Sequence, residues 1–258
     1  MVSTTRAEAS GSSGYVAHPL VEGFPGKSSS HGAFGWSSLW LLDDGIRRVL
    51  VDAGQPAYIP LIHAGLERHG LTTDDITDVL LTHMHWDHVS NFTMFGQATT
   101  WVGESELRWA ADQPAGTAFI PDLHVQELLR RTDRVERMSA GREILPGIHA
   151  IDSAGHTPHH LAFHLERSAE QRVFAGDAVK NAYELTTGRV DSTLDAEASA
   201  ASITALRSLL VDTGATLVPG HDVELRWEGG EAQRVHPQRA AIGFFAGATT
   251  GEEDRSIG

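Results

Sequence analysis

The sequence predicts a layered α/β fold with a functional site at the ends of its strands. Two observations support this prediction. Segments with the composition of strands alternate with segments that space their apolar residues as helices do, which is typical of layered α/β proteins. Polar clusters that contain histidine or aspartate directly follow several of the short apolar strands, and ligands of open α/β sheets bind at that edge.

The first half of the chain predicts a hairpin, a short helix and a buried strand. The apolar segment Trp36–Leu42 and the segment Arg47–Val51 flank an Asp-Asp-Gly turn, which predicts an antiparallel hairpin. Apolar residues over 59–66 lie on one helical face, and Gly70 supplies the helix stop. All residues of Val79–Leu81 are apolar, as expected for a strand that is buried on both faces.

The second half predicts further short strands and one long helix. Residues 104–140 are expected to be helical or irregular, with breaks at Pro114 and Pro121. The segment Ala196–Leu210 carries apolar residues at helical spacing, and Gly214 ends that helix. Strands are expected at Thr99–Val102, Ile148–Ile151, Leu161–Leu165, Val173–Ala175 and, as the final strand, Thr216–Val218.

The composition excludes several classes of protein and of site. The formal net charge of −14 disfavours nucleic-acid backbones and anionic lipids, so we expect no nucleic acid and no membrane as a partner. The absence of cysteine rules out disulfides, thiolate metal sites and a cysteine nucleophile. Neither a secretory signal nor an apolar segment of membrane-spanning length is visible, so we expect a soluble, cytoplasmic protein.

The strongest signal for function is the segment Thr82–His88, which follows a predicted buried strand. His83 and His85 lie two residues apart, so an extended backbone points both side chains to the same side. Asp87 and His88 follow where the chain can turn into a helix. Neutral imidazoles and carboxylates are ligands of first-row transition metals and suit zinc best, so the segment predicts a metal site.

One segment with four ligands cannot complete two metal sites, and three later segments offer the missing ligands. Each of them places a histidine or an aspartate directly after a predicted strand: Gly155–His160, Ala175–Ala178 and Pro219–Asp222. A single histidine is weak evidence for a ligand. The shared position at strand ends nevertheless predicts that these side chains meet at one edge.

The complete set of metal-ligating residues resembles the pattern of the metallo-β-lactamase superfamily of dinuclear metal hydrolases. All seven ligand positions of that pattern are present in order, and the resemblance runs from about Trp36 to Asp222. It implies an α/β fold of the four-layer αββα sandwich type, with the metals at one edge between two sheets. We therefore expect a single domain over residues 14–246, with a disordered lead-in over 1–13 and a flexible tail over 247–258.

The resemblance implies a role for each matching residue and a cofactor of two zinc ions, with iron or manganese as alternatives. The first ion would be held by His83, His85 and His156, the second by Asp87, His88 and His221, and Asp177 would bridge them. Asp52 matches a strand-end aspartate that orients a ligand imidazole, although a plain strand cap is the alternative. His160 matches the last histidine of the family's Gly-His-Thr-Pro-Gly-His pattern, in which this chain has His159 in place of glycine.

The implied chemistry is hydrolysis by a metal-bridging hydroxide, without a covalent intermediate. Two neighbouring dications lower the pKa of a shared water toward neutrality, and one of them polarises the substrate oxygen. Asp87 can hydrogen-bond the nucleophile and pass a proton to the leaving group. The motifs define the metal centre and leave the substrate open. We expect an ester-like bond of a small molecule, with lactones as the leading class.

Two alternatives stay open. The first is a thioesterase of the glyoxalase II type, although such enzymes carry a long C-terminal helical region and only 37 residues follow His221 in this chain of 258. The second is a non-hydrolytic metalloprotein, either a diiron redox centre or a regulatory protein. A complete ligand set favours the hydrolase. No oligomeric state follows from the sequence.

The residues expected to contact the substrate come from three places. Lys180 stands three residues after Asp177, where related lactonases have a tyrosine aimed at the substrate carbonyl. Lys180 would stabilise an oxyanion or bind a substrate carboxylate, and a solvated loop lysine is the alternative. Trp36, Trp86 and Tyr183 are candidates for an apolar wall beside the metals, with core packing as an equal explanation for Trp36.

Overall fold

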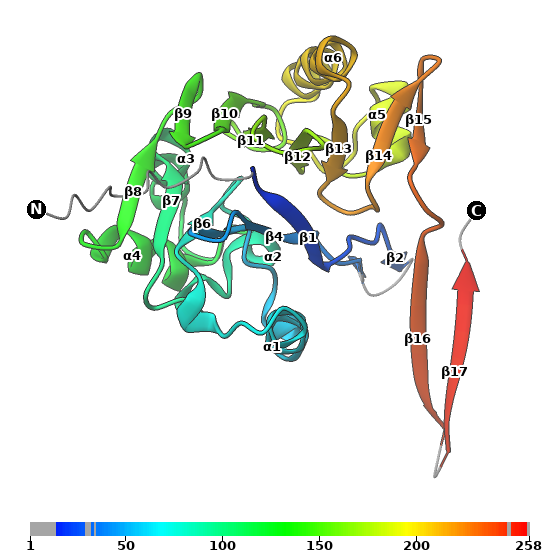
Figure 1. Cartoon of the computed structure of the whole chain (residues 1–258), viewed down its shortest axis with the longest axis horizontal. Coiled ribbons are helices and arrows are strands. Elements are labelled where there is room, and N and C mark those ends of the chain that lie inside the picture. Colours follow the sequence, from blue (N-terminus) through cyan, green and yellow to red (C-terminus); the bar gives the residue numbers. More distant parts are fainter. Residues whose placement is uncertain (1–13, 29–31, 34, 247–248, 257–258) are drawn as a thin grey trace, which may run out of the picture.

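The structure is a computed structural model that describes residues 14–28, 32–33, 35–246 and 249–256. Two mixed β-sheets lie face to face, and helices cover the outer face of each sheet (Figure 1). This arrangement is the four-layer αββα sandwich that the resemblance implied. The expected lead-in over residues 1–13 lies outside the described residues.

The first sheet has six strands in the order β1-β4-β5-β6-β7-β8. The predicted hairpin is β4 and β5, which pair antiparallel, and β5 through β8 run parallel. The carboxyl ends of β5 and β6 therefore bring Asp52 and the segment Thr82–His88 to the same edge. The strands are β1 (Val16–Val21), β4 (Leu39–Asp43), β5 (Arg48–Val51), β6 (Asp78–Leu80), β7 (Thr99–Gly103) and β8 (Val135–Met138).

The second sheet has seven strands in the order β15-β14-β13-β12-β11-β10-β9. Strands β12 and β13 run parallel, so Asp177 and His221, which follow them, emerge at the same edge. Strands β10 and β11 form a hairpin whose loop carries His156. The strands are β9 (Arg142–Leu145), β10 (Ile148–Asp152), β11 (Leu161–Leu165), β12 (Arg172–Gly176), β13 (Thr216–Pro219), β14 (Leu225–Glu228) and β15 (Glu231–Arg234).

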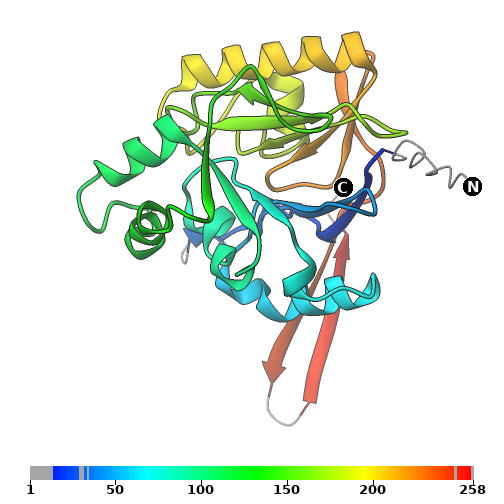
Figure 2. The ribbon, with the colours of Figure 1, turned by 60° about the vertical axis from the view of Figure 1, so that its left-hand side comes forward.

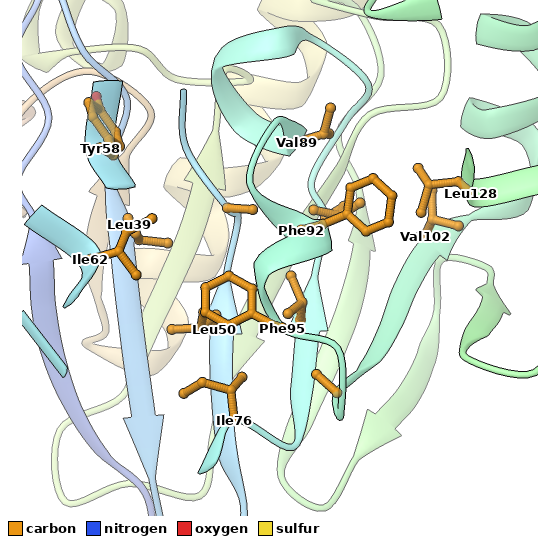
Figure 3. Close-up of a cluster of buried hydrophobic side chains, with 14 of the residues drawn as sticks. Leu39, Leu50, Tyr58, Ile62, Ile76, Val89, Phe92, Phe95, Val102 and Leu128 are labelled. Carbon is orange, nitrogen blue, oxygen red and sulfur yellow. The ribbon is translucent and has the colours of Figure 1, made fainter. Parts of the chain in front are cut away.

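Three separate apolar clusters fill the three spaces between the four layers. Along β4, Leu39 and Leu41 face the outer helices, whereas Trp40 and Leu42 face the second sheet. The same alternation places Phe163 of β11 between the sheets and its neighbour Ala162 on the opposite face. Figure 3 shows the cluster of the first sheet, in which side chains such as Leu50, Phe92 and Phe95 pack together.

The two helices predicted over 59–66 and 196–210 are present, and a glycine follows each of them, whereas the short helix over Ala182–Thr187 was not predicted. Gly70 follows the first long helix with φ 70°, and Gly214 caps the last one with φ 69°, a left-handed conformation that favours glycine. Helices α1 (Ile59–Arg68), α2 (Trp86–Val89), α3 (Glu104–Ala111) and α4 (Asp122–Arg130) belong to the first sheet, and α5 (Ala182–Thr187) and α6 (Ala196–Thr213) to the second (Figure 2). Short 3₁₀ turns lie at Pro56–Tyr58, Thr73–Asp75 and Phe92–Met94.

The prediction that Thr216–Val218 is the final strand is wrong. Strands β14 and β15 continue the second sheet, and β16 (Arg239–Ala246) pairs with β17 (Thr249–Ser256) in an antiparallel hairpin that reaches away from the sandwich (Figure 2). Strand β17 occupies most of the range 247–258, for which the sequence predicts a flexible tail. Strands β1, β8 and β9 were also missed, as was the short pair β2 (Lys27–Ser28) and β3 (Gly32–Ala33).

None of the helices within the described part of the chain combines the length and the apolar composition that crossing a bilayer requires.

Candidate metal centre

The segment Thr82–His88, here called the ligand loop, leaves β6 at the edge between the two sheets. His83 and His88 are buried, and His85 is half-buried. His85 keeps an extended backbone and serves as the N-cap of α2, so Asp87 and His88 lie in the first turn of that helix. The change from extended to helical backbone lets four nearby side chains point into one space.

Asp52 orients two histidines of the ligand loop. Its carboxylate Oδ2 lies 2.7 Å from His88 Nδ1, and Oδ1 accepts hydrogen bonds from the backbone and hydroxyl groups of Thr82. The Thr82 hydroxyl in turn lies 3.0 Å from His83 Nδ1. Since Nδ1 of both rings donates to this network, both Nε2 atoms point into the interior of the site and present lone pairs when the rings are neutral. Asp52 adopts φ 62°, a strained conformation for a residue with a side chain.

The structure brings all seven predicted metal ligands together. Their ligand atoms form overlapping groups whose members lie within 4.8 Å of one another: His83, His85 and His156; His83, His88 and Asp177; Asp87, His88 and His221. His156 Nε2 lies 3.0 Å from His85 Nδ1. The first and third groups coincide with the two triads that the resemblance assigned to separate ions.

Asp177 connects the two triads. Its Oδ2 lies 3.2 Å from His156 Nε2, whereas its Oδ1 lies 3.2 Å from His88 Nε2 and 3.3 Å from His221 Nε2. Each oxygen of this carboxylate thus faces a different triad. Gly220 leaves the room for it, because a Cβ at that position would lie 2.1 Å from Asp177 Oδ1.

His160 holds the backbone that carries Asp177. The amide of Asp177 donates to His160 Nε2 at 3.1 Å, so the other nitrogen, Nδ1, carries the proton and donates to Ser153 Oγ at 2.8 Å. Gly176 permits this close approach, because a Cβ there would lie 2.9 Å from His160 Nε2. His160 therefore positions the aspartate and leaves the metal site to the other histidines.

The donor set fits metal ions. Among the described residues, the buried atoms His83 Nε2, His88 Nε2 and Asp177 Oδ1 make no hydrogen bond. When His88 is neutral, lone pairs of its ring and of the Asp177 carboxylate face each other at 3.2 Å, which is unfavourable unless a cation, either a proton or a metal ion, lies between them. Imidazole and carboxylate ligands suit a first-row divalent ion such as zinc.

Comparison with known families decides the classification. The family described as the metallo-beta-lactamase superfamily matches residues 34–221, which is most of the chain. The chain belongs to the metallo-β-lactamase superfamily. The strand-end histidines and aspartates described above all lie within the matched range. The family and the donor set together support a metal-dependent hydrolase.

Several solved structures share the fold of this chain. A probable metal-dependent hydrolase from Staphylococcus aureus matches 86% of the chain and 96% of its own, with a TM-score of 0.71 and 18% identity. AidC, described as a dizinc quorum-quenching lactonase in complex with a product, matches 95% of the chain and 92% of its own, with a TM-score of 0.63 and 14% identity. At these identities the likeness concerns the fold.

A curated relative matches a smaller part of this chain than these structures do. The atrochrysone carboxyl ACP thioesterase nsrC of Aspergillus novofumigatus is 28% identical over 163 residues, which is 60% of this chain. The match spans 41% of the length of that relative.

The histidines of the first triad are neutral in the metal-free protein. Burial lowers the pKa of His83 and of His156 well below the usual value. Burial also lowers the pKa of His85 to about 4, and that of His160 to about 3. Neutral imidazoles are the metal-binding form, so this triad is ready to accept an ion at neutral pH.

The second triad behaves in the opposite way. Burial opposes protonation of His88 and His221, but the carboxylates of Asp177 and Asp87 outweigh it. They raise the pKa of His88 well above its usual value and that of His221 to about 9. Burial likewise opposes ionisation of Asp177, but His221, His88 and His156 hold its pKa well below the usual range. In the metal-free protein, His88 and His221 therefore carry protons where the second ion would bind.

Lys180 lies beside the site and is paired with Glu184. Its Nζ is 3.0 Å from Glu184 Oε1, and its backbone amide donates to Glu184 Oε2 at 2.7 Å. Both side chains are almost completely buried. The ammonium contributes to lowering the pKa of His85 and of His156, so its charge acts within the metal centre. The substrate contact predicted for Lys180 stays a prediction.

The three aromatic candidates for an apolar wall lie in different environments. Trp36 is half-buried, stacks on Phe24 at 4.8 Å between ring centroids and packs against the core of the first sheet. Trp86 is 39% exposed and Tyr183 is 58% exposed. Phe119, which was not predicted, is 56% exposed, adopts φ 69° and lies 5.4 Å from the His85 ring between ring centroids.

Four further residues of the site were not predicted, because the sequence around each of them is common in proteins and does not indicate a functional role. Thr82 and Ser153 link ligand or supporting histidines to the rest of the network. Glu184 has one recognisable signal, which is its spacing of four residues from Lys180. Glu106 contacts the backbone of two loops that carry ligands.

Proposed function

We propose that this protein binds two zinc ions and hydrolyses an ester-like bond of a small molecule. The observation that carries the proposal is the position of Asp177, whose two carboxylate oxygens face two different triads of ligands. A carboxylate in that position suits two cations side by side better than one. The predicted iron and manganese alternatives use the same ligand types.

The ions would be held by the residues already grouped around Asp177. When bound, such a pair of dications lowers the pKa of water and polarises a substrate oxygen. Asp52 fixes the tautomers of His83 and His88 that leave their Nε2 atoms free for metal. His160 fixes the backbone of Asp177.

Asp87 is the residue best placed to move a proton. Its carboxylate Oδ2 lies 3.4 Å from His221 Nε2, and its side chain stays 17% exposed, more than that of Asp177 at 6%. An ionised carboxylate at the open side of the site can accept a proton from water and transfer it to a leaving group. Burial opposes ionisation, yet the nearby His88 and His221 keep the pKa of Asp87 below its usual value.

Lactones are the substrate class that we favour, and thioesters are the second candidate. The dizinc lactonase with the same fold supports the first choice. The thioesterase relative, 28% identical over 163 residues, supports the second. Both reactions need attack on an activated carbonyl and a donor for the developing oxyanion, for which we propose Lys180.

A panel assay tests the proposal. The zinc-loaded protein is offered lactones, thioesters, phosphodiesters, sulfate esters and β-lactams, with the Asp177→Ala variant as the control. We expect hydrolysis of lactones or thioesters that a chelator abolishes, that zinc restores and that the variant lacks. A protein that binds two ions but hydrolyses none of these compounds would contradict the proposal, and bound iron with a visible absorption band would favour redox chemistry instead.

A further inference from the structure

Glu106 is a buried carboxylate outside the set of metal ligands. It lies in the first turn of α3 and is 1% exposed, whereas Glu104 in the same turn is exposed and pairs with Arg108. Charged side chains are rarely buried without partners, because removal from water is costly. The partners of Glu106 therefore explain its position.

Both oxygens of Glu106 accept hydrogen bonds from backbone groups of loops that carry metal ligands. Oε1 accepts from the amide of Met84 at 3.0 Å, and Oε2 accepts from the amide of His159 at 3.3 Å. Met84 lies between His83 and His85 in the ligand loop. His159 follows His156 in the loop between β10 and β11.

These two loops leave different sheets, and one triad of ligands spans them. The ligand loop follows β6 of the first sheet, whereas the β10–β11 loop belongs to the second sheet. His83 and His85 come from the former and His156 from the latter. A backbone hydrogen bond from Leu161 to Thr82, 2.9 Å long, joins the loops at the base. Glu106 adds a connection next to the ligands themselves.

We propose that Glu106 is a positioning residue that holds the two loops at the separation at which His83, His85 and His156 share one ion. This inference rests on the proposed dinuclear centre. The requirement is geometric: one carboxylate accepts two donors from two loops, and a side chain with a single acceptor satisfies only one of them.

Metal binding by variants of Glu106 tests the inference. Glu106→Gln keeps the size but places an NH₂ group against one of the two backbone amides. Glu106→Asp keeps the charge but is too short to reach both loops. Glu104→Gln, in the same helical turn, is the matched control. Cobalt(II) titration in competition with a chelator gives the two affinities, the visible spectrum reports ligand geometry, and thermal unfolding of the metal-free proteins reports stability.

We expect Glu106→Gln and Glu106→Asp to weaken binding of the ion held by His83, His85 and His156 by about tenfold or more and to change the cobalt spectrum, since loss of an outer partner of metal ligands costs about 10–100-fold. Glu104→Gln should behave as wild type. Unchanged affinities and spectrum in both Glu106 variants overturn the inference. Equal weakening of both ions together with a lower melting temperature also overturns it, because that result indicates a general role in folding. A wild-type protein that binds no metal refutes the proposed function itself.

Discussion

Removal of the metals should reverse the dependence of stability on pH. In the metal-free protein, burial opposes protonation of His221, but Asp177 and Asp87 raise its pKa from 6.5 to about 9. The folded state therefore holds this proton more tightly than the unfolded state. The resulting stabilisation is complete below about pH 6.5 and is lost as the pH rises through about 9.

The size of the effect follows from the shift. At about 1.4 kcal/mol per pKa unit, the shift of His221 corresponds to a loss on the order of 3 kcal/mol of unfolding free energy over that range. His88, whose pKa is also raised by Asp177 and Asp87 against the effect of burial, contributes with the same sign. The metal-loaded protein should behave in the opposite way, because bound ligands are deprotonated and metal affinity rises with pH.

Urea unfolding of the chelator-treated and the zinc-loaded protein between about pH 6.5 and 9 measures how the unfolding free energy of each form changes with pH. The matched control is Asp177→Asn, which keeps the size of the side chain and removes the charge on which both histidines depend. We expect the variant to lose most of the slope in the metal-free state. Metal-free wild-type protein whose stability is constant or rises over this range would refute the reasoning.

Further predictions concern individual side chains of the site. Asp177→Ala should lower the affinity for both ions and the rate of hydrolysis by more than the ~10–100-fold that is typical of residues that only support metal ligands. Circular dichroism should show that the fold is intact. Full activity of this variant would show that the role assigned to Asp177 is wrong. Lys180→Ala should lower kcat/KM by about tenfold or more with both ions retained by elemental analysis, with Lys180→Arg intermediate, whereas unchanged kinetics would mark a lysine without a role in catalysis. Because burial beside Asp177 raises the pKa of Glu184, the added change Glu184→Gln should recover stability lost in Lys180→Ala. Phe119→Gly should stabilise the fold by about 1 kcal/mol, since φ 69° is strained for phenylalanine, and should raise KM for an apolar substrate; an unchanged melting temperature would count against strain at this position.

The metal centre could be predicted because its signals are local. The ligand loop concentrates four donors within a few residues, and the other ligands directly follow apolar strands that the pattern of hydrophobic residues reveals. Parallel pairing of β5 with β6 and of β12 with β13 then brings their ends to one edge. The sandwich itself came from the resemblance and not from periodicity.

The missed strands have little signal of their own. Strand β8 has two adjacent exposed charged residues between two buried ones, and β15 has the polar sequence Glu-Ala-Gln-Arg with no buried residue. Strands at the margin of a sheet form because a neighbour offers hydrogen-bond partners, and that neighbour is remote in sequence. The prediction that the strands ended at residue 218 failed for this reason.

The supporting residues of the site were hidden for a related reason. Glutamate in a short helix is normally expected to face solvent. Only the tertiary fold shows that Glu106 is buried between two loops, whose backbone amides donate hydrogen bonds to it. The sequence placed Lys180 near Asp177, but a spacing of four residues to Glu184 did not reveal that both side chains are buried. Phe119 lies between helices α3 and α4, 34 residues after His85, whose ring it contacts.

The measurement that tests the central claim most directly is the metal content of the purified protein. Seven ligands arranged in two triads around Asp177 predict about two equivalents of metal per chain, chiefly zinc, when the protein is prepared without chelator and analysed by elemental mass spectrometry. Asp177→Ala, prepared in parallel, should retain clearly less. A wild-type value near zero after reconstitution with zinc would contradict the account of this site.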